Sequence, residues 1–228
     1  MPLLIAVALI MVLQWPVAAW AKGRAIDSDD QVCDPLADYY LGMEDYPQAI
    51  RRHLEVIRDH PKDALAYYHL GFAYGMLGNH RRELADYKHA VELGLSDWQL
   101  FANLGLAYMG AGQMEEAIAV LRLATLLGPY HPETHYDLGL AYERADMTGP
   151  ARQEVLTSLR LDPSQLDARD TLGVIYAEQG DYVRARQTWT DLAGADPAYS
   201  PARVNLSILK GIERGEFNRT RPISGFAH

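Results

Sequence analysis

The stretch Leu104-Gly105-Leu106-Ala107-Tyr108 recurs along the chain at a fixed interval. Versions of it begin at Leu70, Leu138 and Leu172, so that four glycines follow one another in steps of 34 residues, at positions 71, 105, 139 and 173. A constant period of this size is typical of a solenoid, in which each repeat buries its apolar face against its neighbours. The repeats therefore predict an array of small units and not one globular core.

Two further markers keep the same period. A small residue recurs at Ala49, Ala117, Ala151 and Ala185, and a proline recurs at Pro61, Pro129, Pro163 and Pro197. Together with the Leu-Gly-x-x-Tyr element, this pattern resembles the tetratricopeptide repeat, a 34-residue helix–turn–helix unit. The resemblance covers residues 30–199 and implies an all-α fold, a right-handed superhelical α-solenoid of about five helix pairs.

The period also sets the expected domain organisation. Five units are expected, at residues 30–63, 64–97, 98–131, 132–165 and 166–199, and a capping helix over 200–214 completes a solenoid spanning 30–214. Pro35 falls inside the first helix, which we expect to begin late. In the fourth unit Asp146–Pro150 replaces the glycine turn, and Pro150 suits an early helical position. Residues 215–228 contain proline and glycine without periodicity and are expected to be disordered.

Residues 1–21 form a separate, uncharged segment. An apolar run over 3–13 is followed by Ala19-Trp20-Ala21, which predicts a secretory signal peptide cleaved after Ala21 and a short linker over 22–31. Because no Lys or Arg precedes the run, the alternative is an uncleaved segment that anchors the chain to the inner membrane. The expected location is periplasmic or secreted, with membrane contact only through this segment if it is retained.

Charge and cysteine content exclude some partners. The chain has 30 acidic and 21 basic residues and a formal net charge of −9, which argues against nucleic acid. Cys33 is the only cysteine. It takes the repeat position of Tyr67 and Phe101, so we expect a packed apolar side chain.

A second stripe on the first helices carries the functional expectation. In the tetratricopeptide family this stripe lines the concave surface and binds extended or helical peptides, so the resemblance implies a peptide-binding groove here. Its residues, with two neighbouring asparagines and an aspartate, are Leu65, Tyr68, Phe72, Ala102, Asn103, Leu106, Met109, Glu133, Tyr136, Asp137, Leu140, Glu143, Asp167, Asp170, Val174 and Asn205. The stripe begins apolar and becomes acidic, which favours a partner segment with a hydrophobic anchor followed by Lys or Arg.

Alternatives remain for individual members of this stripe. Any one of Leu65, Phe72, Leu106 or Leu140 could instead pack on the first helix of the neighbouring repeat. Asn103 and Asn205 each match an asparagine that contacts peptide backbone in the family, but solvated helix surface is the alternative that we favour for each. The basic clamp that some family members use for a carboxylate terminus has no counterpart, because Tyr68, Ala102 and Asp170 stand at matching positions.

The sequence offers no reactive constellation. His131 and His135 stand four residues apart, but Pro132 starts the helix between them and His135 occupies the large-residue position of its unit. There is no phosphate-binding glycine loop and no nucleophile motif. We therefore expect no enzyme activity, no cofactor and no metal site.

The resulting functional hypothesis is a non-catalytic protein–protein interaction scaffold in envelope complex assembly, which binds a peptide or helix of another protein. One alternative is a homo-oligomer that assembles through its C-terminal tail, which carries Arg214, Arg219 and Arg221. Another is an accessory subunit of a periplasmic enzyme or maturation complex.

Overall fold

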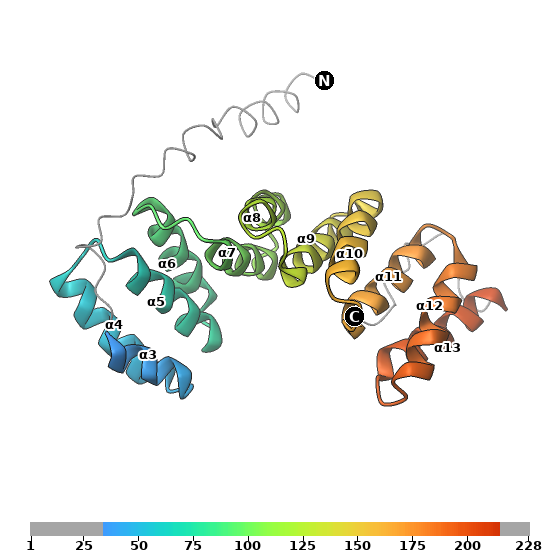
Figure 1. Cartoon of the computed structure of the whole chain (residues 1–228), viewed down its shortest axis with the longest axis horizontal. Helices are drawn as coiled ribbons and strands as arrows, with labels where there is room; N and C mark the ends of the chain where they lie inside the picture. The colour runs from blue at the N-terminus through green and yellow to red at the C-terminus, as the bar shows by residue number, and fades with distance from the viewer. Residues whose placement is uncertain (1–33, 215–228) are drawn as a thin grey trace, which may run out of the picture. The chain divides into compact units, whose positions relative to one another are not determined.

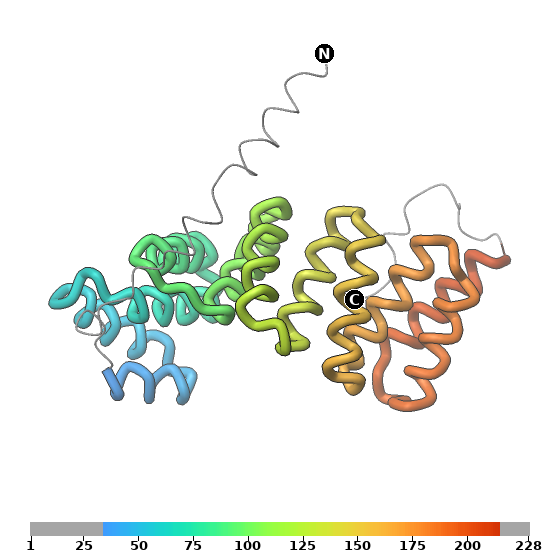
Figure 2. The backbone as a smooth tube through the Cα atoms, turned by 45° about the horizontal axis from the view of Figure 1, so that its top comes forward, coloured from blue at the N-terminus to red at the C-terminus, as the bar shows by residue number. Residues whose placement is uncertain are grey.

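The computed structural model describes residues 34–214, and these residues form helices throughout (Figure 1; Figure 2). No strand occurs among them. The eleven helices are α3 (Pro35–Gly42), α4 (Tyr46–Asp59), α5 (Ala64–Met76), α6 (His80–Glu92), α7 (Trp98–Gly110), α8 (Met114–Leu127), α9 (Pro132–Arg144), α10 (Thr148–Leu161), α11 (Leu166–Glu178), α12 (Tyr182–Ala195) and α13 (Ser200–Glu213). The all-α prediction is confirmed.

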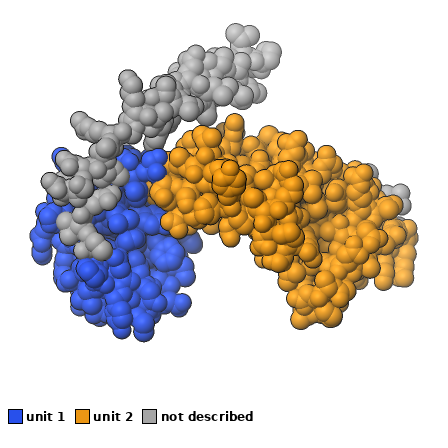
Figure 3. All heavy atoms as spheres, in the orientation of Figure 1, with its two compact units in different colours: residues 1–96 blue, residues 97–228 orange. Residues whose placement is uncertain are grey.

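The chain divides into two compact units, which Figure 3 colours separately. Unit 1 ends at Ser96 and contains α3–α6; unit 2 begins at Asp97 and contains α7–α13. Within each unit, consecutive helices pack on one another as antiparallel pairs. The predicted signal peptide and linker, Cys33 and the tail over 215–228 lie outside the described residues.

The recurring glycine allows the two helices of a repeat to approach closely. In unit 2, a Cβ added to Gly105 would lie 2.4 Å from Leu121 Cγ, and one added to Gly173 would lie 2.4 Å from Trp189 Nε1. Real Cβ atoms do not make contacts this short, so any larger residue would force the helices apart. The second to fifth repeats thus each join a glycine on the first helix to an apolar side chain on the second, whereas the first repeat has Ala37 at this position.

The turn inside each repeat needs one residue in the left-handed conformation. Gly78, Gly112 and Gly180 supply it, with φ between 72° and 76°, and glycine adopts this conformation without steric cost. Asp146 takes the same position in the fourth repeat, with φ of 58°. The helix pair forms there nevertheless, with Pro150 in the first turn of α10.

The two ends of the helical array differ in their construction. Helix α3 has only eight residues and begins at Pro35, where Asp34 caps it by accepting hydrogen bonds from two backbone amides. At the other end, α13 buries Leu209 and Ile212 against the last repeat and exposes Arg203 and Lys210. A polar outer face of this kind is what a terminal repeat needs.

Within residues 34–214, none of the helices combines the length and the apolar character that crossing a membrane requires.

Candidate protein-interaction surface

The first helices of successive repeats form a row in unit 2. Helix α9 contacts both α7 and α11, and α11 contacts α13 (Figure 1). Polar side chains bridge this row: the Tyr136 hydroxyl lies 3.4 Å from Thr171 Oγ1, and the Tyr199 hydroxyl donates a 2.8 Å hydrogen bond to Asp167 Oδ1. The row is therefore one layer, whose outward side chains lie on a shared surface.

Ten of the sixteen predicted groove residues keep exposed or half-exposed surface: Leu65, Tyr68, Phe72, Asn103, Leu106, Glu133, Tyr136, Asp137, Leu140 and Asp167. The first three lie on α5 of unit 1, and the other seven lie on α7, α9 and α11 of unit 2. We call those seven the inner-row surface of unit 2. Leu106 is 42% exposed.

The structure corrects the other six: Ala102, Met109, Glu143, Asp170, Val174 and Asn205 are buried. The Asn205 side-chain amide donates to both oxygens of Asp170, at 3.1 and 3.3 Å. These six side chains are enclosed between packed helices, so they have no surface for a partner. The expectation that Asn205 is solvated was also wrong, because its exposed fraction is 0%.

Charge is distributed unevenly over the inner-row surface. Helix α7 contains no charged residue, whereas α9 carries Glu133 and Asp137 and α11 carries Asp167. Burial, with the nearby Glu133 carboxylate adding to it, raises the pKa of Asp137 to about 7. Burial also raises the pKa of Asp170 to about 6. Asp137 keeps some exposed surface but is poorly solvated, so a cationic side chain beside it would stabilise its ionised form.

A second acidic group lies at the C-terminal ends of the same helices. Burial, with the charges of Glu143 and Asp146 adding to it, raises the pKa of Glu178 to about 7. The carboxyl ends of helices already carry partial negative charge, so they favour cations and disfavour additional carboxylates. The acidic residues near both ends of α9 and α11 therefore favour basic groups.

The aromatic residues of unit 1 form their own cluster. Phe72 is 36% exposed, and its ring meets that of Tyr46 edge to face, with the centroids 6.3 Å apart. Tyr68 packs beside the buried Tyr87, with centroids 5.8 Å apart. Tyr68 is half-buried, whereas Phe72 is exposed.

His131 and His135 do not share a site. The His131 ring stacks on Trp98 with the centroids 3.8 Å apart, and His131 is the residue that directly precedes α9. His135 Nδ1 lies 2.7 Å from Glu154 Oε2, and its Nε2 lies 3.1 Å from the Pro129 carbonyl oxygen. The His131 imidazole thus takes part in packing inside its repeat, and the His135 imidazole bridges Glu154 of its own repeat and Pro129 of the preceding one.

The sequence analysis missed one polar cluster in unit 1, formed by Asp38, His53 and His69. Among the described residues, it is the only group of three or more His, Cys, Asp or Glu side chains with ligand atoms close together. The sequence did indicate this cluster when equivalent positions of the repeats are compared. His53 occupies the position that Tyr87, Leu121, Val155 and Trp189 take in the later repeats. A histidine at a position that is otherwise apolar and buried breaks the pattern.

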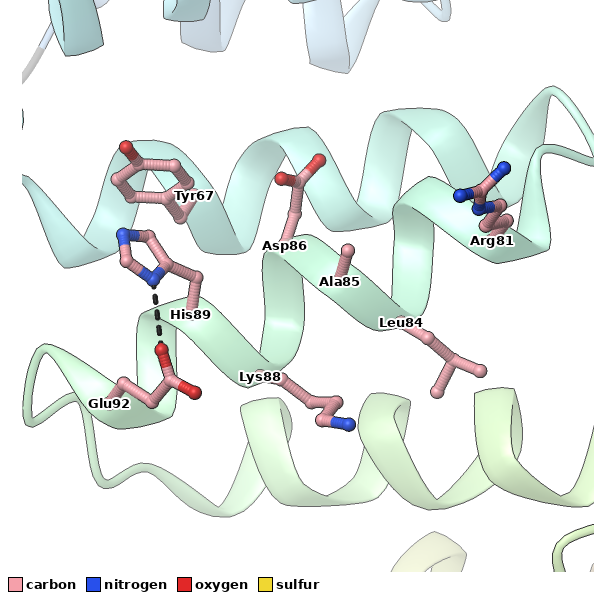
Figure 4. Close-up of a pocket in the computed structure, with 8 residues that line it drawn as sticks. All are labelled: Tyr67, Arg81, Leu84, Ala85, Asp86, Lys88, His89 and Glu92. Atoms are coloured by element: carbon pink, nitrogen blue, oxygen red, sulfur yellow. Dashed lines mark hydrogen bonds and ion pairs between the residues drawn. The ribbon is translucent and has the colours of Figure 1, made fainter.

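A shallow pocket lies on α6, the second helix of the second repeat, in unit 1 (Figure 4). Its lining combines both signs of charge: Tyr67, Arg81, Leu84, Ala85, Asp86, Lys88, His89 and Glu92. Tyr67 comes from α5, and its ring meets the His89 ring edge to face at 4.4 Å. Burial raises the pKa of Asp86 to about 6 in spite of the neighbouring Arg82 and His89. None of these residues was predicted as a site.

Comparison with known proteins supports the repeat assignment. Two family models described as tetratricopeptide repeat match residues 35–97 and 99–131. Neither model describes an enzyme family. No curated protein matches the sequence significantly.

Several solved structures have the same fold. YrrB, a TPR protein with an unusual peptide-binding site, is 19% identical and superposes with a TM-score of 0.67, covering 79% of this chain and 89% of its own. MamA from Desulfovibrio magneticus RS-1 is 19% identical, with a TM-score of 0.66 and coverages of 74% and 99%. The pilF protein of Pseudomonas aeruginosa is 20% identical, with a TM-score of 0.67 and coverages of 79% and 82%. Similarity at these identities concerns the fold.

The 34-residue period, the glycine crossings and the paired helices agree with both family matches. Residues 35–97 and 99–131 are tetratricopeptide repeats, and a chain built of such repeats is a protein-interaction scaffold.

Proposed function

We propose that the chain is a non-catalytic scaffold that holds a segment of another protein against the inner-row surface of unit 2. The observation that carries the proposal is the change of character along that row. An uncharged helix with an exposed Leu106 is followed by helices with exposed Glu133 and Asp167. A segment with an apolar anchor and a Lys or Arg beyond it complements this order.

The polar character of the surface supports a reversible contact. Leu106 and Leu140 offer apolar area, while Tyr136 adds a ring and a hydroxyl group to the middle of the row. Tyrosine is among the residues that contribute most to binding at protein interfaces. For a short segment that buries this area, we expect a Kd of about 1 μM, equivalent to about −8 kcal/mol.

The first experiment measures binding of a labelled peptide by the full chain. The peptide carries one Leu or Phe anchor followed by three Lys or Arg residues, and a second peptide has Glu in place of the basic residues. We expect Leu106→Asp to abolish binding of the basic peptide. Glu133→Lys should weaken it by about fivefold and reduce its dependence on salt.

Matched controls separate the inner row from general charge effects. Glu115 is exposed on α8, the second helix of its repeat, so Glu115→Lys makes the same change of charge away from the row. We expect it to leave affinity within twofold. Equal losses from Glu115→Lys and Glu133→Lys, or equal binding of the acidic peptide, would refute the assignment of the surface.

Binding should also depend on pH in a defined direction. Asp137, with a pKa of about 7, is largely protonated at pH 5.5 and largely ionised at pH 8. A bound cation favours the ionised form, so the basic peptide should bind more tightly as the pH rises and should release protons on binding. Asp137→Asn should flatten this dependence. A lower affinity at pH 8 than at pH 5.5 would contradict the proposal.

The cellular location belongs to the same proposal. The uncharged run over residues 1–21, followed by Ala-x-Ala, supports export and a role in envelope complex assembly. Mass spectrometry of the protein recovered from cell fractions tests this. A mature chain beginning at Lys22 in the periplasmic fraction supports it, whereas an intact N-terminus in the cytoplasmic fraction overturns it.

A further inference from the structure

We propose that Asp38, His53 and His69 form a binding site for a divalent transition-metal ion such as Zn²⁺ in unit 1. The three side chains come from three successive helices, α3, α4 and α5. One ligand atom of each, a ring nitrogen or a carboxylate oxygen, lies within 4.8 Å of the other two. Two imidazoles and one carboxylate are a ligand set that zinc and iron(II) accept.

The distances suit a tetrahedral centre. His69 Nδ1 and Asp38 Oδ1 are 3.3 Å apart. Two ligands that each lie about 2.1 Å from a tetrahedral ion are about 3.4 Å apart. The His53 and His69 ring centroids are separated by 4.9 Å. Side-chain rotation is enough to bring the three ligand atoms around one ion.

His53 supplies a second, independent indication. Its side chain is 3% exposed, and its Nε2 atom is buried without a hydrogen-bond partner. Buried polar atoms in native proteins almost always have a partner, and an exception needs an explanation. The other repeats place Tyr, Leu, Val or Trp at this position, so packing alone does not require a histidine. A metal ion would supply the missing partner.

The charge environment fits a dication. Burial lowers the pKa of His53 to about 4, and the neighbouring His69 ring contributes to the shift; burial also lowers the pKa of His69. Both rings are therefore neutral near pH 7, which is the form that ligates metal. The nearby carboxylates of Asp34 and Asp63 have defined structural partners, the Arg52 guanidinium at 2.9 Å and the Ala66 amide at 2.9 Å.

The site has access to solvent and a structural use. The Asp38 side chain is 42% exposed and that of His69 is 21% exposed, which leaves an entry path and room for a water ligand. Helix α3 has only eight residues and lies at the start of the array. An ion held by α3, α4 and α5 together would fasten this short helix to the unit.

The test measures metal binding by the metal-free full chain, without an affinity tag and with Cys33→Ser so that no thiol contributes. Zinc is titrated calorimetrically. We expect one equivalent per chain with a Kd of about 1 μM or tighter. His53→Gln and His69→Gln should each weaken binding by about tenfold or more. Zinc should also slow hydrogen exchange in α3.

A matched control uses another histidine that already has a carboxylate neighbour. His89 Nδ1 lies 3.1 Å from Glu92 Oε2 on α6 of the same unit, and His89→Gln should leave the affinity unchanged. A loss at His89→Gln equal to that at His53→Gln would overturn the proposal, as would zinc binding that survives both cluster substitutions.

A measurement on the chain with its histidines intact covers the case in which a variant fails to fold. In a long-range ¹H–¹⁵N spectrum of the imidazole rings, one equivalent of zinc should shift the resonances of His53 and His69 alone. Shifts that appear only at other histidines, or no shift at one equivalent, would refute the site.

Discussion

The two units use the same repeat but differ in the titratable groups that distinguish them. Unit 1 encloses His53 and His69, whose pKa values burial lowers; unit 2 encloses Asp170 and partly encloses Asp137, whose pKa values burial raises. The same helix-pair geometry thus favours a pair of unprotonated imidazoles in unit 1 and protonated carboxyls in unit 2, although burial also raises the pKa of Asp86 in unit 1. The repeat sets the geometry, and single substitutions at its buried positions set the chemistry.

The largest expected effect comes from the large side chain that meets the glycine. Trp189 in unit 2 and His53 in unit 1 occupy equivalent positions. Trp189 is completely buried, so Trp189→Ala should lower the free energy of unfolding of unit 2 by about 3–5 kcal/mol. His53→Leu, in metal-free buffer, should instead stabilise unit 1 by about 1 kcal/mol because it removes a buried nitrogen without a partner.

Pulse-labelling hydrogen exchange across a urea series measures both units in one experiment. Protection in α11–α13 should be lost at lower urea in Trp189→Ala, and protection in α3–α6 should persist to higher urea in His53→Leu. Equal destabilisation by the two substitutions would remove the contrast between the units.

The next effect should be common to both units. Gly105→Leu and Gly71→Leu each place a side chain against the second helix, where an added Cβ would meet Leu121 at 2.4 Å or Tyr87 at 2.5 Å. Overpacking of this kind costs about 1–3 kcal/mol. Thermal unfolding followed by circular dichroism tests it.

Gly110→Ala provides the control in the same helix as Gly105, because an added Cβ there has no atom within 4 Å. It should leave the melting temperature nearly unchanged. A melt of Gly105→Leu that coincides with that of Gly110→Ala would mean that the crossing is placed wrongly.

The smallest effect should separate the units by pH. The folded-state pKa of His53 lies below its unfolded value of 6.5, so the unfolded chain takes up the proton first as the pH falls. His53 should therefore cost unit 1 about 2 kcal/mol of stability between pH 8 and pH 5, and Asp86, whose pKa burial raises to about 6, should offset part of this loss. The folded-state pKa values of Asp137 and Asp170 lie above the unfolded value of 3.8, so unit 2 should gain stability as the pH falls from about 7 toward 4.

Single substitutions sharpen this test. His53→Leu should flatten most of the acid sensitivity of unit 1, and Asp170→Asn should reduce the pH response of unit 2 while keeping an acceptor for Asn205. The measurement is urea unfolding equilibrated at each pH and followed by an exchange pulse at one fixed pH. Parallel pH profiles for the two units would contradict the comparison.

The repeat architecture could be predicted from the sequence because its signals are periodic. The glycine series indicated the helix crossings, and the glycine and proline positions indicated the turns, including the late start at Pro35. A helix crossing depends on residues inside one repeat, so local spacing is enough to predict it.

The surface could be predicted only in part, because a first helix packs on its neighbours as well as on its own partner. Leu106 and Asp170 both belong to the predicted stripe, yet one is 42% exposed and the other 1% exposed. The difference depends on contacts between repeats, such as the hydrogen bonds from Asn205 to Asp170. The Asp38–His53–His69 cluster was missed because its members lie on three helices and match no linear motif.

The glycine crossing has a consequence for how such a chain can change over generations. Gly105 and Leu121 fix the spacing of their helices from inside the repeat, while Leu106, one position further along, faces away from that contact and stays exposed. Adjacent codons thus serve separate demands, one for shape and one for selectivity. A lineage can replace the outward residues one at a time, and so acquire new binding preferences, while the underlying frame remains as it was.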